Sequence, residues 1–249
     1  MVRNQQKRTA IGVAAAALVA GALVTAVHAP EGSAAPAARP AGGLDSSRFV
    51  RPADNPWFPL VPGTVVRYRG TDEGERLHEH VRVTHRTKVI EGVRTRVLVD
   101  VLRRADGSLA EKTHDWYAAD RDGNVWYFGE RTATYDEQGH LESREGSWEA
   151  GVDGARAGLI MRADPHPTDA YRQELYRGHA EDQAWIVQRN VSARTPLRHF
   201  RHALRSMEWS RLEPHVMSQK LYARGIGIVA EKDLSGGHET FHVVSVQRP

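Results

Sequence analysis

Residues 94–130 decide the fold and read RTRVLVDVLRRADGSLAEKTHDWYAADRDGNVWYFGE. Most of this stretch alternates apolar and polar residues and is rich in β-branched and aromatic side chains, a pattern typical of strands. Two five-residue segments interrupt it, 104–108 (RADGS) and 120–124 (DRDGN), and both have glycine at the fourth position. Glycine there fits a type I turn closed by a left-handed residue in a bulge, so each segment predicts a tight hairpin.

The same pattern continues outward in both directions. Residues 136–140 (DEQGH) predict a third hairpin of the same kind. Consecutive tight hairpins build an antiparallel meander, because parallel strands need long crossovers. Further strands are expected at 65–69, 77–84, 87–90, 204–209, 216–222, 227–231 and 240–246, and strand-like stretches at 171–191. The predicted fold is therefore all-β, an antiparallel meander forming a curved sheet, half-barrel or sandwich.

The second hairpin predicts which side chains share a face. Side chains alternate along a strand, so pairing of residue 120 with 124 places Trp116, Ala118, Trp126 and Phe128 on one face. Asp115, Tyr117 and Tyr127 fall on the other. The first face is aromatic enough to be either a packed core or the lining of a cavity for an apolar ligand, and both readings stay open.

The N-terminal segment predicts export. Residues 1–8 carry three basic residues and no acid, and residues 11–27 are small or apolar throughout, so residues 1–29 are expected to be a signal peptide with a helical core. Cleavage as late as residue 37 is an alternative, and an uncleaved anchor is another. Residues 30–43, rich in Ala, Pro and Gly, predict a disordered linker. Residues 44–249 then form a single β-rich extracytoplasmic domain, secreted or at the cell surface.

Residues 55–64 open this domain with three prolines. Proline fixes φ and removes a donor, so an extended arm is expected here rather than a helix. Its aromatic and aliphatic side chains are expected to pack across a sheet edge, with a ligand mouth as the alternative.

The composition excludes several classes of function. The chain has no cysteine, which excludes disulfides, thiolate metal sites, a cysteine nucleophile and lipid attachment at cysteine. The net charge is +3, and basic residues alternate with acidic ones along the sequence. Without a basic stripe or a known binding module, no nucleic-acid partner is expected. Contact with a membrane is expected only through an uncleaved N-terminal segment.

Three motifs carry a resemblance to a known family. They are DWYAAD at 115–120, GNVWYFGE at 123–130 and GSWEAGVDGA at 146–155. On these motifs the chain resembles an uncharacterised family of secreted or surface-anchored bacterial β-rich proteins. The resemblance implies a single β-rich domain behind a signal or lipid anchor, and it brings no established activity.

Two constellations are candidates for chemistry. Asp115, Glu130, Glu149 and Asp153 lie near tryptophans in the sequence, and paired acids beside aromatic platforms are what a glycan hydrolase requires. Acids in such turns more often accept hydrogen bonds from backbone amides. His78 and His80, two apart on a strand, form a candidate metal site with His114, with ordinary surface histidines as the alternative. No phosphate-binding, dinucleotide or GxSxG motif is present, so no cofactor is expected.

Two functions of different class follow. The favoured one is a non-catalytic extracytoplasmic domain that binds an apolar or amphipathic small molecule on its aromatic face, where the binding residues would be Trp116, Trp126, Phe128 and Trp148. The alternative is a cell-envelope glycan hydrolase that uses paired carboxylates near Trp148. The first is favoured over an enzyme because every strong signal in the sequence is architectural.

Overall fold

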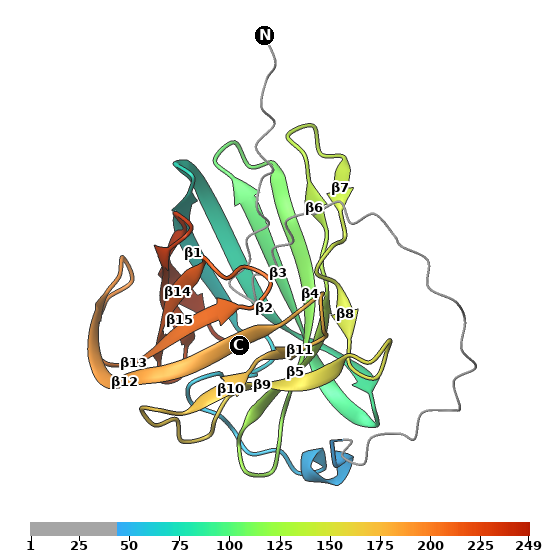
Figure 1. Ribbon diagram of the computed structural model, residues 1–249. Coiled ribbons are helices and arrows are strands. Elements are labelled where there is room, and N and C mark those ends of the chain that lie inside the picture. The colour runs from blue at the N-terminus through green and yellow to red at the C-terminus, as the bar shows by residue number, and fades with distance from the viewer. Residues whose placement is uncertain (1–43) are drawn as a thin grey trace.

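The computed structural model describes residues 44–249 (Figure 1). The expected signal helix and linker fall on residues 1–43 and lie outside the described residues. A short 3₁₀ helix, η1 (Ser46–Phe49), comes first, and the rest of the described chain contains strands and turns without an α-helix. No helix in residues 44–249 is long and apolar enough to cross a membrane.

The strands are antiparallel neighbours in one sheet. In chain order they are β1 (Val65–Asp72), β2 (Glu75–Ile90), β3 (Val93–Arg104), β4 (Leu109–Ala119), β5 (Val125–Arg131), β6 (Thr134–Tyr135), β7 (Leu141–Ser143), β8 (Trp148–Glu149), β9 (Arg156–Met161), β10 (Ala170–Arg172), β11 (Glu174–Leu175), β12 (Asp182–Arg194), β13 (His199–Ser210), β14 (Met217–Ala223), β15 (Gly227–Ser235) and β16 (Thr240–Gln247). The all-β antiparallel prediction is confirmed.

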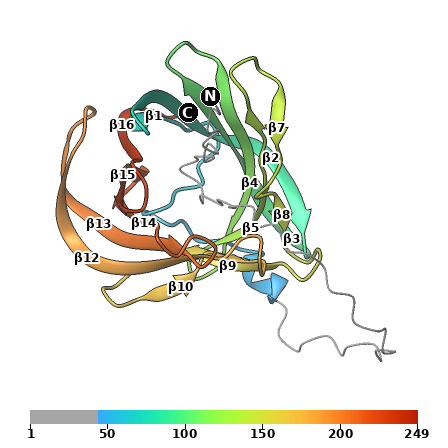
Figure 2. The same ribbon diagram turned by 45° about the horizontal axis from the view of Figure 1, so that its top comes forward.

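The sheet closes almost completely on itself. Its order runs from β10 through β12–β16, then β1–β5, to β9 and β11. β10 pairs with β12 at one edge and β11 pairs with β9 at the other. Only Gln173 separates β10 from β11, and its N–H donates to the carbonyl of Asp182 (2.8 Å). The segment 170–175 thus joins the two edges, and the result is a barrel-like sheet, called the barrel below (Figure 2).

The three predicted hairpin turns are confirmed. Gly107, Gly123 and Gly139 have φ of 89°, 83° and 82°. In each turn the glycine N–H donates to the carbonyl three residues before it, at 2.9–3.1 Å. Left-handed geometry is costly for other residues, so these glycines fix the registers of the strands around them.

The N-terminal arm crosses one end of the barrel instead of lying along a sheet edge. Asn55 fixes it: Nδ2 donates to the carbonyls of Gly123 (2.8 Å) and Arg162 (2.9 Å), while Oδ1 accepts from the N–H groups of Trp57 and Phe58. On the far side of the barrel, Gly225 N–H donates to Pro56. The arm therefore bridges opposite walls, and Trp57 is buried in the core.

Candidate functional site in the barrel interior

Two tyrosines from the β4–β5 hairpin form the centre of the barrel interior. The rings of Tyr117 and Tyr127 stack with centroids 4.5 Å apart, and both residues are at most 1% exposed. Tyr127 Oη donates to Asp115 Oδ1 (2.8 Å). These three share a face, as the alternation predicted, and it is this face that points inward.

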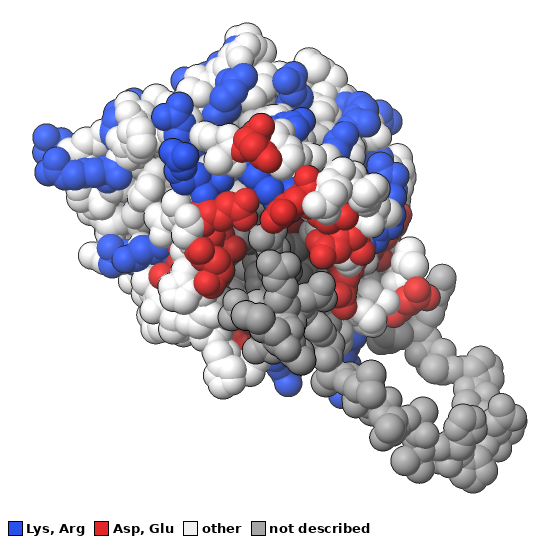
Figure 3. Space-filling model, turned by 90° about the horizontal axis from the view of Figure 1, so that it is seen from above, with Lys and Arg blue, Asp and Glu red and all other residues white. Residues whose placement is uncertain are grey.

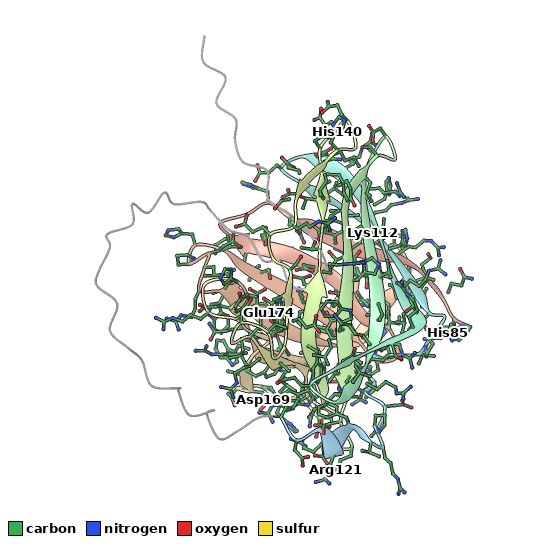
Figure 4. All side chains as sticks on the ribbon, turned by 90° about the vertical axis from the view of Figure 1, so that its right-hand side faces the viewer. His85, Lys112, Arg121, His140, Asp169 and Glu174 are labelled. Carbon is green, nitrogen blue, oxygen red and sulfur yellow. The ribbon has the colours of Figure 1, made fainter. Side chains whose placement is uncertain are left out.

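The interior carries buried carboxylates beside the tyrosines. Asp115 and Glu130 lie directly opposite each other on β4 and β5 and are 0% and 3% exposed. Burial raises the pKa of both well above the usual range, and nearby carboxylates, Asp100 for Asp115 and Glu174 for Glu130, raise it further. Glu174 accepts a hydrogen bond from Trp148 Nε1 (3.3 Å) and comes from the short strand that closes the barrel (Figure 4).

On the opposite wall one buried lysine lies within ion-pair distance of two carboxylates. Lys220 Nζ lies 3.1 Å from Glu208 and 3.4 Å from Glu231, and all three side chains are 6–7% exposed. Burial alone would raise the pKa of Glu208, but Lys220 and hydrogen bonds from Ser206 and Tyr222 lower it below the usual value. Burial raises the pKa of Glu231 to about 8 despite Lys220, and Glu208 adds to the rise. Near neutral pH this trio therefore holds one proton on Glu231 and one ion pair.

Several interior carboxylate oxygens accept no hydrogen bond from the described part of the chain. They include Asp115 Oδ2, Glu174 Oε2 and Glu231 Oε2. A buried polar atom without a partner costs free energy, so most such atoms in proteins are paired. The interior therefore offers several acceptors to a molecule that carries donors. Seen from above, acidic side chains gather around the centre of the molecule, and basic ones lie mostly outside them (Figure 3).

A pocket lies between the two walls. Its free volume is about 60 Å³, which is room for about two water molecules or one ammonium-sized group. Its polar lining residues are Thr64, Asp115, Gln173 and Lys220. The apolar wall includes Phe58, Val66, Tyr68, Leu98, Tyr117, Ile160, Tyr222 and Ile228.

The structure divides the aromatic residues expected to bind ligand. Trp126 and Phe128 pack edge-on against Phe49 of η1, with centroids 6.4 and 5.6 Å apart, and neither lines the interior pocket. Trp116 lies beneath the ammonium of Lys88, 3.6 Å from the ring centroid. Trp148 packs edge-on against Tyr127 (5.3 Å). Trp116 and Phe128 are not directly paired, since the register shifts between Asp115 and Tyr117.

Five of the expected site residues line one hollow of about 610 Å³. They are Trp116, Trp148, Glu130, Glu149 and His114. Lys88 spans this hollow and forms an ion pair with Glu149 (2.6 Å). Trp116 and Trp148 are only 7% and 4% exposed, so little of either ring is accessible in the hollow.

The four expected acids do not face one another across an open groove. Glu130 and Glu149 both line the hollow, but Glu149 forms the ion pair with Lys88 and Glu130 is only 3% exposed. Asp115 and Glu130 are close together but buried. Asp153 is exposed in the turn before β9, with φ of 49°.

The three expected metal-binding histidines lie on the outside of the sheet among arginines. Burial lowers the pKa of His80, and Arg67, Arg103 and Arg82 lower it further. Burial lowers the pKa of His114 to about 4, and three nearby cations contribute, of which Arg131 has the largest effect. Within residues 44–249 no group of three or more His, Asp or Glu residues is arranged to hold a metal ion.

Sequence reasoning missed the Lys220 trio and Glu174. One signal was available in the sequence. Glu208 continues the alternation of Leu204 and Ser206, which places its charged side chain on the same inward face as these small or apolar side chains. Alternation alone could not reveal that Glu208, Lys220 and Glu231 meet, because they come from three different strands.

Comparison with known proteins gives structural likeness only. No family model and no curated protein sequence matches the chain. Among solved structures, the chain is similar to a predicted exported protein with a YmcC-like fold from Bacteroides fragilis, with a TM-score of 0.46 and 12% identity over 77% of this chain and 99% of that one. It is also similar to a predicted lipoprotein from Parabacteroides distasonis, with a TM-score of 0.42 and 11% identity over 78% of this chain and all of that one.

Proposed function

We propose that this is a non-catalytic extracytoplasmic domain that binds an amphipathic small molecule, and that the molecule's donor-bearing head group occupies the barrel interior. The observation that carries the proposal is Asp115 Oδ2, a buried oxygen without a donor on a carboxyl that lines the pocket beside its apolar wall; Glu174 Oε2 and Glu231 Oε2 are buried in the same way elsewhere in the interior. An amine would satisfy the Asp115 acceptor and exchange a proton with a carboxyl of raised pKa. The basic N-terminus and the apolar run after it support a place outside the cytoplasm.

The proposal moves the binding site from the expected tryptophan face to the tyrosine face. Tyr117 and Tyr222 line the pocket, and a cationic head group is attracted to aromatic faces as well as to carboxylates. The free volume of about 60 Å³ suits a primary ammonium better than a bulky ring.

The test is calorimetric titration of the full chain with octylamine, using octanoate and octanol as probes of the same length. Octylamine should bind and octanoate should not, because Asp115 can give its proton to an amine, whereas Lys220, the cation of the pocket, is already paired with Glu208. Asp115→Asn should weaken octylamine binding at least tenfold, whereas Glu149→Gln, outside the barrel, should leave it unchanged. Equal binding of all three probes, or equal weakening by both variants, would contradict the proposal. Native mass spectrometry of the protein from its own envelope would then identify the natural ligand.

A further inference from the structure

The outward face of β1–β4, extended to the end of β5, carries a regular array of cations. Arg69, His78 and Arg103 are aligned across β1, β2 and β3 by direct strand pairing. In the next row, Arg67 pairs with His80, which is aligned through Val101 with Lys112. In the third, Arg82 is aligned through Val99 with His114 and Arg131. These nine residues are called the basic array.

The array has a fixed geometry because it is built on strands. Residues two apart on a strand are separated by about 6.8 Å, and neighbouring strands by about 4.8 Å. The three rows therefore cover a patch more than ten ångströms wide in both directions. Figure 4 faces this side of the molecule, with Lys112 labelled on β4.

The charge of the array is not neutralised by its neighbours. Its five arginines and Lys112 are all exposed, and none forms an ion pair within the described residues. The acids of the same strands, Glu79, Asp100 and Glu111, occupy the inward positions. The sheet thus separates charge that alternates along the sequence, which is why the sequence alone gave no basic stripe.

We propose that the basic array binds a linear acidic polysaccharide by its charge. Long-range attraction to a polyanion with release of its counterions would supply the affinity. An anionic bilayer fits less well, because surface-binding elements combine cations with exposed aromatic or aliphatic side chains. The apolar residues within the second and third rows are Val101, which is buried, and Val99, which is half-buried. Single-stranded nucleic acid fits less well too, because the array offers no aromatic ring for base stacking.

A second feature points to a sugar chain. His114 and Arg131, at the end of the third row, also line the hollow of about 610 Å³ beside Trp116 and Lys88. A polymer lying on the array would reach this hollow without a break. There a sugar unit would meet cations, the Glu149 carboxylate and the edge of an aromatic ring.

The test is binding of polygalacturonate to the full chain at several salt concentrations, with neutral dextran as the reference polymer. The array variant combines Arg69→Gln, Arg82→Gln and Lys112→Gln, one substitution in each row. The side chains of these three residues form no hydrogen bond or ion pair within the described residues. The matched control is Arg156→Gln, Arg177→Gln and Arg201→Gln, which removes the same charge from exposed sites elsewhere.

Polygalacturonate should bind and dextran should not. The array variant should weaken binding about tenfold or more at low salt and reduce the slope of log K against log salt by about two. The control should change neither. Bound polymer should also raise the pKa of His114, which can be followed by NMR. No such rise is expected if the residues of the array have only a structural role.

Three results would overturn the proposal. They are no salt-dependent binding of polygalacturonate, equal weakening by both variants, and tighter array-dependent binding of single-stranded DNA or of phosphatidylglycerol vesicles than of polygalacturonate. The outcome is independent of octylamine binding, because the array and the interior lie on opposite faces of the sheet.

Discussion

The ammonium of Lys220 lies 3.1 Å from Oε2 of Glu208, and both side chains are almost inaccessible to solvent. Glu208 also accepts hydrogen bonds from Ser206, Tyr222 and Gln173. A charge in such a place is stable only while its partners remain, because desolvation is costly. This pair therefore ties β13 to β14 inside the barrel, at the wall opposite the tyrosine stack.

Lys220→Met should destabilise the fold by about 3–5 kcal/mol, because Glu208 would keep a buried charge without a counterion. Urea denaturation measures the change. The control is Lys232→Met on the exposed face of β15, which should stay within about 0.5 kcal/mol. If the two variants lose the same stability, Lys220 does not hold the interior together.

Stability should fall as the pH rises from 7 to 8.5. Burial raises the pKa of Asp182 to about 7 and of Glu231 to about 8, so in this range the native protein binds more protons than the unfolded chain. The stabilising contribution of these carboxyls is complete at a pH below their pKa in the unfolded chain. It is lost as the pH rises through their higher pKa in the native protein. Histidines with lowered pKa, such as His114, act in the opposite direction but only up to about pH 6.5.

The measurement is the unfolding midpoint temperature, which should drop by several degrees across that range. Glu231→Gln should flatten the profile because it removes a carboxyl whose pKa, about 8, lies within this range. His238→Gln, at an exposed site, should leave most of the drop in place. A wild-type midpoint that is constant or rises with pH would show that these carboxyls are already ionised.

Gly107→Ala and Gly139→Ala should each destabilise the fold by about 1 kcal/mol, because alanine is strained in the left-handed backbone conformation. No steric overlap adds to this cost, since an added Cβ meets open space at both sites. Gly129→Ala should cost more, about 3 kcal/mol, because φ is 121° and the Cβ would overlap the carbonyl of Trp148. Chemical denaturation of the three variants checks this order. Equal losses would mean that the close approach of β5 and β8 relaxes without cost.

These glycines also mark the limit of what could be predicted. The hairpin turns depend on five consecutive residues each, so their geometry could be read from the sequence, and with it the sharing of one face by Tyr117 and Tyr127. Which face points inward depends on where distant strands close the sheet. The tryptophan-rich face was expected to be a packed core or the lining of a cavity, yet η1 covers Trp126 and Phe128, and Lys88 covers Trp116.

The last prediction concerns Asn55, which fastens the arm across the end of the barrel. Its side chain makes hydrogen bonds with four backbone groups, at Gly123, Arg162, Trp57 and Phe58. Asn55 is only 3% exposed, so Asn55→Ala would remove the partner of these groups in a mostly buried place and should cost about 2–4 kcal/mol. Asp54→Ala, one residue earlier and exposed, is the control and should cost less than about 0.5 kcal/mol.

Loss of this anchor should act on the arm more than on the sheet. Gly225 N–H donates to Pro56 of the arm, whereas the Tyr117–Tyr127 pairing lies within the sheet. Hydrogen exchange in Asn55→Ala should therefore speed up at Gly225 well before it does at Tyr127, because local opening needs less free energy than global unfolding. If Gly225 stays as protected as in the wild type, the hydrophobic contacts of Trp57 and Phe58 hold the arm without Asn55. If both amides speed up together, the arm and the sheet unfold as one unit, and closure of this end is part of the global fold.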